Sequence, residues 1–573
     1  MNKHAIYHIK EAPYTYGIGE KTLALRLRAA KGDLKSCKIY YKDRYDWKTE
    51  FEVKELELVN TSNLFDYYEC RIEVEEKRFR YFFELEDNDE SICYLNERGL
   101  VTERPEEPNA FQFPYLCLAD IYDEVNWAQE GIIYQIFPDR FCNGDKSNDP
   151  DGTLPWGEEV TEKTMFGGDI QGIINKVNYL KDLGVTMIYM TPIFMSKSNH
   201  KYDTKSYYEV DPHFGDNEKL RELIKRCHDA GIKVILDAVF NHSGKDFFAF
   251  EDVIDKGKKS KYKDWYFINS YPVDTEKVNY ITFADNVANM PKLNTKNSKV
   301  KKYLLKIAKY WIEEIGIDGW RLDVCDEVDH VFWREFKKTV KKANKDAFII
   351  GEIAHESGSF LKGDQLDSIM NYPFRECCLD FFARRNITAE ELDHILAENR
   401  SSYMNSVNRQ LLNLIDSHDT PRFLTECEDD KEKMKLAIVL QYTYIGVPYI
   451  YYGDEIGLAG GKDPECRRCM IWEEDKQDKE LLDFYKKMNI MRKKYKTLVY
   501  GEYTNVYKKE MVLGFVRKHK DEEVLILINN SDDSFNYVTD IKGTVFNIFE
   551  EEEEIVDGRI ELNPMSFKAL KIK

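Results

Sequence analysis

Eight short hydrophobic runs follow one another along the middle of the chain, and stretches with helical spacing separate them. One such stretch places Leu220, Leu223, Ile224 and Cys227 on a single helix face and ends at Gly231. A strand buried on both faces is a continuous apolar run, and regular alternation of strands with helices indicates a parallel sheet. The pattern therefore predicts an α/β fold built on a (β/α)8 TIM barrel. Its strands are expected at residues 132–137, 185–190, 234–236, 317–322, 347–350, 368–370, 411–415 and 448–452.

Both ends of the chain alternate apolar and polar residues in the manner of β-strands. Pro105, Pro108 and Pro114 interrupt this pattern before the barrel begins. The gap between the third and fourth hydrophobic runs is too long for one crossover helix, which predicts a small inserted domain. The expected domains are an N-terminal β-sandwich at 1–121, the barrel at 122–242 and 297–499, the inserted domain at 243–296, and a C-terminal β-sandwich at 500–573.

Charge and composition narrow the choice of partner. The 573 residues carry a formal net charge of -20, with 43% hydrophobic and 32% charged residues. This charge repels phosphate backbones and anionic lipid, so we expect neither nucleic acid nor a membrane as partner, and a neutral ligand such as a sugar fits better. The first residues lack the apolar core of a secretion signal, from which we expect a cytoplasmic protein.

Twelve cysteines are spread along the chain without the spacing of a small disulfide framework, which predicts reduced thiols. Cys466 and Cys469 form a C-x-x-C pair that could hold zinc or cycle as a redox pair. Because no second pair or histidine cluster accompanies them, we interpret them as ordinary core thiols.

Polar residues cluster at the ends of four of the hydrophobic runs. These are Asp237 with Asn241 and His242, Arg321 with Asp323, Glu352 after Gly351, and Ser417 with His418 and Asp419. In a (β/α)8 barrel the chemistry lies where the strands end, so carboxylates far apart in the chain are expected to meet in one pocket.

These four segments, in this order, resemble those of the α-amylase family of glycoside hydrolases, and the resemblance covers essentially the whole chain. The segment Met290-Pro-Lys-Leu-Asn294 resembles the signature of the cyclomaltodextrinase, neopullulanase and maltogenic amylase group. The resemblance implies a retaining enzyme that cleaves α-1,4 bonds of cyclodextrins, maltooligosaccharides and pullulan or starch. It leaves transglycosylation open as a second reaction. It also implies a homodimer formed through the N-terminal domain, which narrows the active-site cleft.

Cleavage with retention needs one carboxylate that attacks the anomeric carbon and one protonated carboxyl group, about 5 Å apart. The resemblance assigns Asp323 as the nucleophile, Glu352 as the acid/base and Asp419 as the group that stabilises the transition state. Arg321 points to the same side of its strand as Asp323 and should keep it ionised. Glu352, crowded by two other carboxylates, should have a raised pKa.

The resemblance also assigns residues that bind the sugar. His242 and His418 would donate to hydroxyl groups, and Tyr202 would stack on the ring at the cleavage site, although a core tyrosine is the alternative. Asp463 and Arg467 would bind glucose units on the non-reducing side. Their alternative is a surface ion pair worth about 0 to 1 kcal/mol.

A cluster of oxygen-bearing side chains suggests a structural Ca²⁺, which takes six to eight oxygen ligands. The spacing is not that of an EF-hand, and a turn rich in Asn, Asp and Gly is the alternative reading, which the family resemblance disfavours. The expected ligands are Asn143, Asp145, Asn148, Asp149, Asp169 and the carbonyl of Gly167.

One departure and two rival functions remain open at this stage. Ala354 stands where relatives often have a Trp that lines the subsites beyond the cleavage point, so transglycosylation efficiency and large-substrate preference do not carry over. The enzymatic rival is an α-1,6-glucosidase or a trehalose-forming transglycosylase, against which the Met290–Asn294 segment argues. The other rival is a non-catalytic sugar-binding protein, which would lack one of the three acids.

Overall fold

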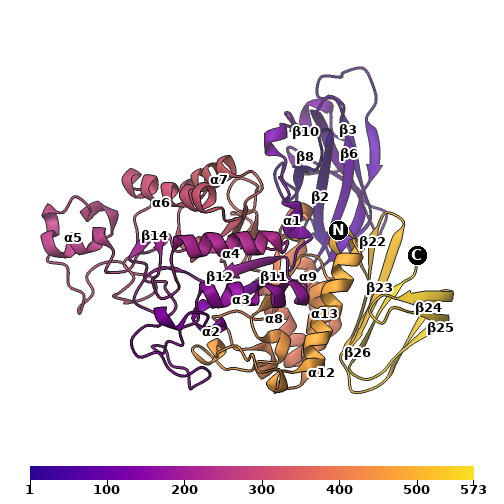
Figure 1. The fold of residues 1–573 in the computed structure, drawn as a ribbon. Coiled ribbons are helices and arrows are strands. Elements are labelled where there is room, and N and C mark those ends of the chain that lie inside the picture. The colour runs from indigo at the N-terminus through magenta and orange to yellow at the C-terminus, as the bar shows by residue number, and fades with distance from the viewer.

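A computed structural model describes all residues 1–573, and eight parallel strands form its central sheet (Figure 1). The strand order is β18-β17-β16-β15-β12-β11-β20-β19. A parallel bridge between Met370 and Leu412 joins the two edges and closes the barrel. Each predicted run overlaps one of these strands, which confirms the predicted fold class. Their bounds are β11 Ile133–Ile136, β12 Met187–Met190, β15 Lys233–Ala238, β16 Gly319–Leu322, β17 Phe348–Gly351, β18 Ser368–Ile369, β19 Leu412–Leu414 and β20 Val447–Tyr451.

Helices follow the strands and cover the outside of the barrel (Figure 1). In α7 the buried residues Phe332, Trp333, Phe336 and Val340 recur every three or four positions, which forms the stripe that packs on the sheet. An aspartate caps the N-terminus of several of these helices, because its carboxylate accepts the otherwise unpaired N–H groups of the first turn. None of the helices combines the length and the apolar character that crossing a bilayer requires. The main helices are α3 Ile170–Leu183, α4 Asn217–Asp229, α6 Ser298–Tyr310, α7 His330–Ala343, α8 Tyr372–Cys378, α9 Ala389–Ser401, α12 Lys431–Thr443 and α13 Lys479–Lys494.

The N-terminal region consists of two antiparallel sheets with one core between them. Leu25 and Cys70 come from one sheet, Ile39 and Phe83 from the other, and all four belong to the same buried cluster. The two faces thus bury each other as a β-sandwich. Its strands are β1 Thr15–Gly17, β2 Thr22–Ala30, β5 Glu57–Thr61 and β6 Phe65–Glu73 in one sheet, with β3 Leu34–Lys42, β4 Glu52–Glu55, β7 Phe79–Asp87, β8 Ile92–Asn96, β9 Gly99–Val101 and β10 Phe111–Phe113 in the other.

The C-terminal region is an antiparallel sheet of six strands, ordered β21-β22-β23-β26-β24-β25. Phe515 and Ile526 belong to the large buried cluster that includes the barrel. Leu527 and Leu570 instead pack with Val556 and Ile560 of β25 in a second small core. The sheet therefore has two buried faces. Its strands are β21 Glu502–Lys509, β22 Val512–His519, β23 Glu522–Asn529, β24 Phe535–Asn547, β25 Glu552–Leu562 and β26 Ser566–Lys571.

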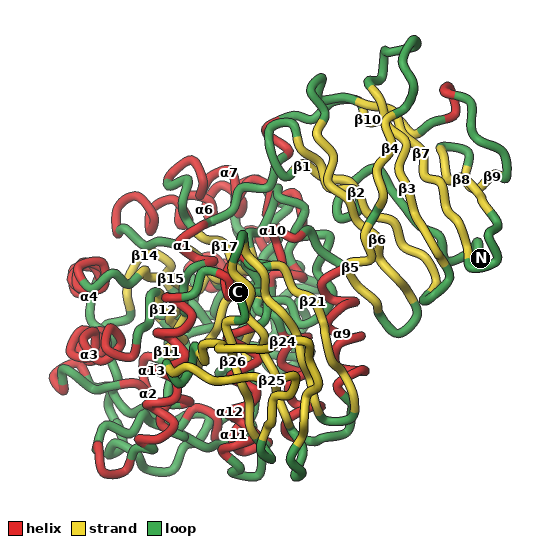
Figure 2. Tube along the Cα trace, turned by 90° about the vertical axis from the view of Figure 1, so that its right-hand side faces the viewer, coloured by secondary structure: helices red, strands yellow, loops and turns green.

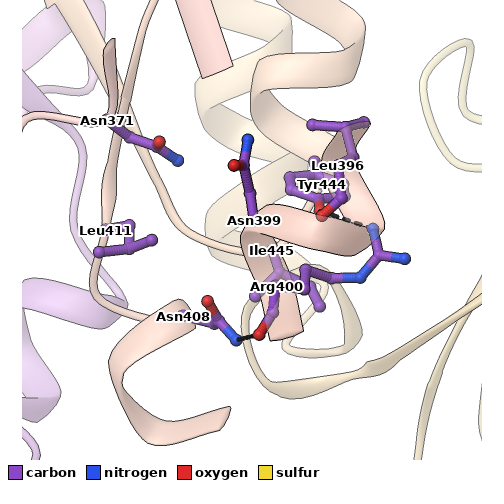
Figure 3. Close-up of a pocket in the computed structure, with 8 residues that line it drawn as sticks. All are labelled: Asn371, Leu396, Asn399, Arg400, Asn408, Leu411, Tyr444 and Ile445. Atoms are coloured by element: carbon purple, nitrogen blue, oxygen red, sulfur yellow. Dashed lines mark hydrogen bonds between the residues drawn. The ribbon is translucent and has the colours of Figure 1, made fainter. Parts of the chain in front are cut away.

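Helix α9 is the element that joins the N-terminal, barrel and C-terminal regions, and Figure 2 shows it beside β5 and β21. Its residue Arg400 donates to the Asn60 side chain at 3.0 Å and to the Tyr444 hydroxyl at 2.6 Å. The same guanidinium lies 4.4 Å from the ring centre of Tyr503 in β21. Figure 3 shows Arg400 and Tyr444 in the small cavity at this junction. One buried cation thus contacts all three regions.

The long connection from β15 to β16 forms an excursion that carries α5 (Phe248–Lys256), which projects on the left of Figure 1. Isolated bridges pair Tyr266 with Leu293 and His242 with Lys292. The second bridge ties the excursion to the barrel mouth. A hairpin of β13 (Phe194–Met195) and β14 (Ser206–Val210) follows β12 and supplies another part of the mouth.

Candidate active site

The barrel register brings the four polar strand ends together. Asp237 of β15 lies directly beside Arg321 of β16. Asp323 and Glu352 each follow the last residue of their strands by one position, and their backbone N–H groups continue the ladder to Ala238 and Leu322. The three acids expected at the site thus all project from the same end of the barrel, with Asp419 in the loop after β19.

Arg321 is the centre of the charge arrangement. Its Nη1 donates to Asp237 Oδ2 and to Asp323 Oδ1, both at 2.9 Å, and its Nη2 lies 2.5 Å from Glu352 Oε1. Burial lowers the pKa of this guanidinium, but the surrounding groups, Asp237 and Glu352 foremost among them, raise it overall. One permanently charged group therefore fixes three carboxyl groups in a dry pocket.

Asp323 has one oxygen left free. Oδ1 accepts from Arg321, whereas Oδ2 is buried and has no hydrogen-bond partner. The next residue, Val324, has φ 45°, a left-handed conformation that is costly for a β-branched side chain. Its N–H donates to Glu352 Oε2 at 3.0 Å. The strained turn thus connects the backbone after Asp323 to the second carboxyl group.

The two carboxyl groups titrate together. Burial, followed by the Glu352 charge, raises the pKa of Asp323, and burial and the Asp419 charge raise the pKa of Glu352. Like charges this close hold one proton between them over a wide pH range. Arg321 contacts both carboxyl groups, and Asp323 and Glu352 therefore share one proton and one negative charge beside the same guanidinium.

Tyr202 and His418 form one face of the site. Their rings stack at 5.7 Å with an interplanar angle of 10°, and the Tyr202 hydroxyl lies 2.7 Å from His418 Nε2. Burial lowers the pKa of His418 well below its usual value, so the imidazole is neutral. Gln135 Nε2 lies 2.7 Å from His418 Nδ1, which leaves the hydrogen on Nε2. That nitrogen can donate to a carboxylate or to a sugar.

His242 follows the end of β15 by four residues and is buried. Burial and Lys292 lower its pKa to about 3, and its Nε2 is buried without a partner. Its ring lies 5.0 Å from that of Phe283, which belongs to the excursion. The Lys292 ammonium group binds Asn241 and lies 2.8 Å from Glu327 Oε2. The Met290–Asn294 segment, whose sequence resembles the group signature, contains Lys292. This segment therefore lies against the strand end that carries His242.

Asp463 and Arg467 lie in the loop after β20 as an ion pair at 3.1 Å. The guanidinium also donates to the His418 carbonyl at 2.7 Å and to Asp419 Oδ1 at 2.9 Å. A pocket of 170 Å³ opens beside it, lined only by polar residues and Pro464: Arg140, Thr161, Glu162, Asn199, His200, Asp463 and Arg467. The structure thus brings this pair to Asp419, one of the three acids expected at the site.

The structure also shows residues that the sequence reading missed. The Tyr189 hydroxyl donates to Asp237 at 2.6 Å, and Gln135 sets the tautomer of His418. Arg140 donates to the carbonyls of Arg467 and Thr164. The sequence could have indicated Gln135, since it is a polar residue inside an apolar run. Arg140 follows the first barrel strand, and no sequence pattern indicates its role.

The predicted calcium ligands also lie close together, around the start of α3. The side-chain oxygens of Asn143 and Asn148 are buried and have no hydrogen-bond partner. A Cβ on Gly167 would lie 2.2 Å from Asp149 Oδ1, so this position accepts only glycine. Asp169 instead caps α3 and accepts hydrogen bonds from four donors, those of Gly144, Asp145, Asn148 and Gly172. No three His, Cys, Asp or Glu side chains gather as a metal site. The available donors are amide and carbonyl oxygens beside Asp149, a set that suits a hard cation such as Ca²⁺.

Comparisons with known proteins agree with this geometry. The family model "Alpha amylase, catalytic domain" matches residues 135–501, and "Alpha amylase, N-terminal ig-like domain" matches residues 1–117. A cyclomaltodextrinase of Thermoanaerobacter pseudethanolicus is 51% identical over 93% of this chain and 93% of its own length. Neopullulanase 2 of Thermoactinomyces vulgaris is 47% identical over 92% and 91%. A solved structure of a cyclomaltodextrinase superposes with a TM-score of 0.96 at 41% identity and covers 100% of both chains.

The chain belongs to the alpha-amylase family of glycoside hydrolases. Within the family it falls in the group of cyclomaltodextrinases, neopullulanases and maltogenic amylases, at 43 to 51% identity.

Proposed function

We propose that this enzyme hydrolyses α-1,4 bonds of cyclodextrins, maltooligosaccharides and pullulan or starch with retention of configuration. The observation that carries the mechanism is the free, buried Oδ2 of Asp323 beside Glu352, a carboxyl group whose pKa burial raises. The group to which the relatives belong supports the substrate class.

In the first step, Asp323 Oδ2 attacks the anomeric carbon while Glu352 gives its proton to the departing glycosidic oxygen. The C–O bond to the leaving sugar breaks, and an ester forms between the sugar and Asp323. In the second step, the Glu352 carboxylate takes a proton from water, whose oxygen attacks the same carbon and releases Asp323. Two inversions give net retention.

The surrounding residues act on charge and position. Arg321 holds the Asp323 carboxylate in the attacking orientation. Asp419 stabilises the positive charge that develops on the sugar ring, and neutral His418 and His242 donate to its hydroxyl groups. Tyr202 supplies a flat surface for the ring next to the broken bond.

A product analysis tests this proposal. Incubation with β-cyclodextrin should open the ring and release short maltooligosaccharides, and NMR of the first products should show the α-anomer. An α-1,6-glucosidase would instead cleave panose at its α-1,6 bond and leave β-cyclodextrin intact. A non-catalytic sugar-binding protein would release no reducing sugar from either substrate.

We also propose that the loop before α3 binds a structural Ca²⁺ through Asn143, Asn148, Asp149 and the Gly167 carbonyl. Asp145 and Asp169 contribute negative charge, and the unpartnered amide oxygens support the proposal. When bound, the ion would neutralise the carboxylates and fix the loop.

Chelation should therefore lower the melting temperature, because an ion that binds only the folded chain stabilises it by mass action, about 2.7 kcal/mol at 100 times Kd. Calorimetry with and without EDTA measures the effect, and added CaCl₂ should reverse it. Asp149→Asn should lose Ca²⁺ binding in titration calorimetry, while Asp151→Asn, exposed in the same loop, should retain it. A wild-type protein that takes up no Ca²⁺ would refute the site.

We further propose that the protein is a homodimer associated through the N-terminal region. Half of the exposed large hydrophobic side chains, 11 of 22, lie in residues 1–121. Tyr45 and Trp47 are 60% and 63% exposed on one loop. Such a concentration is typical of an interaction surface.

Light scattering after size exclusion should give twice the mass of one chain. Replacing Tyr45 and Trp47 by Ser should shift the equilibrium towards the monomer, because aromatic anchors supply much of an interface's binding energy. Ile555→Ser is the control, since this residue is 86% exposed in the C-terminal region and should not affect association. A wild-type monomer at micromolar concentration would contradict the dimer.

Finally, we propose a cytoplasmic location, because twelve unpaired thiols suit a reducing compartment.

A further inference from the structure

Arg467 lines the polar pocket and also contacts Asp419. Its Nη1 faces Asp463 at the pocket, and its Nη2 donates to Asp419 Oδ1 at 2.9 Å. Its Nε donates to the His418 carbonyl, which also accepts from the thiol of Cys466. The guanidinium therefore spans the residues that hold Asp419 and the wall of the pocket.

Asp419 needs such support because its side chain is 42% exposed, far more than that of Asp323 at 7%. Its other oxygen lies 3.0 Å from His418 Nε2. An exposed carboxylate with only one further partner populates several rotamers, and each wrong rotamer removes the charge from the sugar ring.

Arg467 is itself firmly held. Its side chain is only 11% exposed, and its backbone carbonyl accepts from Arg140 at 2.9 Å. Arg140 is buried beside Asp139, whose carboxylate also accepts from the Phe166 and Gly167 N–H groups. The loop after β20 is thus anchored to the loop after β11, which fixes the position of the guanidinium.

We propose that Arg467 is a positioning residue for Asp419, in addition to the sugar-binding role that the family resemblance implies. This inference rests on the proposed function and deepens it. If Arg467 only bound sugar, its loss would raise KM. Because it orients a carboxylate that acts in the transition state, its loss should lower kcat as well.

The test uses the whole enzyme and 4-nitrophenyl α-maltoside, whose second glucose unit we expect to reach the pocket. Arg467→Ala should lower kcat about 10-fold to 100-fold, in the range expected for a charge-assisted hydrogen bond. Asp463→Asn removes the partner on the pocket side and should raise KM more than it lowers kcat. Arg468→Ala is the matched control, since this neighbouring arginine is 47% exposed and donates only to the Ala459 carbonyl and Glu465.

A second readout separates positioning from a folding defect. Millimolar guanidinium should restore part of the kcat of the Arg467→Ala variant and should not affect the Arg468→Ala variant. A kcat within twofold of wild type in Arg467→Ala, or a loss that guanidinium does not rescue, would overturn the inference. Failure of the wild-type enzyme to cleave the maltoside would refute the proposed function instead.

Discussion

Replacing Asp323 by Asn should abolish hydrolysis, with kcat reduced on the order of 10⁴-fold or more. The amide keeps the shape of the side chain and can still contact Arg321, but it cannot form the ester with the anomeric carbon. The variant should remain folded, because the amide keeps the volume of the side chain and Asp237 still pairs with the Arg321 guanidinium. Initial rates on β-cyclodextrin and a circular dichroism melt measure both parts of this expectation.

Asp326→Asn is the control for this prediction. Asp326 lies three residues further along the chain, at the surface, and binds His355 at 3.0 Å. It should keep activity close to that of wild type. Trapping offers a direct check, since a 5-fluoro glycosyl fluoride should add its mass to the peptide that contains Asp323. Substantial cleavage by Asp323→Asn, or a label on another carboxylate, would refute the nucleophile assignment.

The barrel could be predicted from the sequence because each of its strands is buried on both faces and leaves a continuous apolar run. Even β18, which is only Ser368–Ile369 in the structure, had such a run. The β13–β14 hairpin was missed, since two residues of β13 are too few to show a period. The contacts of Arg400 with Asn60 and Tyr503 were also out of reach, because periodicity reports which face is buried and not which distant segment covers it.

The candidate site also contains some features that the sequence predicts and others that it does not. The strand-end acids could be placed at one mouth because barrel topology brings all strand ends together. The free oxygen of Asp323 and the bond from Arg467 to Asp419 depend on rotamers and loop paths, which no pattern of residue types encodes. Asp169 illustrates the difference. The sequence suggested a metal ligand, and the structure shows its oxygens accepting four hydrogen bonds at the start of α3.

Replacing Glu352 by Gln should lower kcat on β-cyclodextrin by about 10²-fold to 10⁴-fold, the usual contribution of a general acid. The loss should be much smaller on α-maltosyl fluoride, because fluoride leaves without a proton.

The raised pKa of Glu352 also sets the direction in which activity changes with pH. Burial raises the pKa of Glu352, so in the wild-type enzyme this carboxyl group stays protonated as the pH rises above 4.5. Activity should fall only when the pH passes the raised pKa of Glu352. The variant cannot titrate there, and its residual activity on the fluoride should lack this alkaline limb.

Azide distinguishes the two carboxyl groups. The experiment uses the Glu352→Ala variant with α-maltosyl fluoride as substrate. Azide can enter the space of the missing side chain and attack the covalent intermediate on Asp323, which should give α-maltosyl azide with net retention. If Glu352 were the nucleophile, the same variant would have no ester to attack. Azide would then displace fluoride directly and give the β-anomer. The anomer measured by NMR therefore decides which of these acids bonds to the sugar, independently of how far either variant falls in rate.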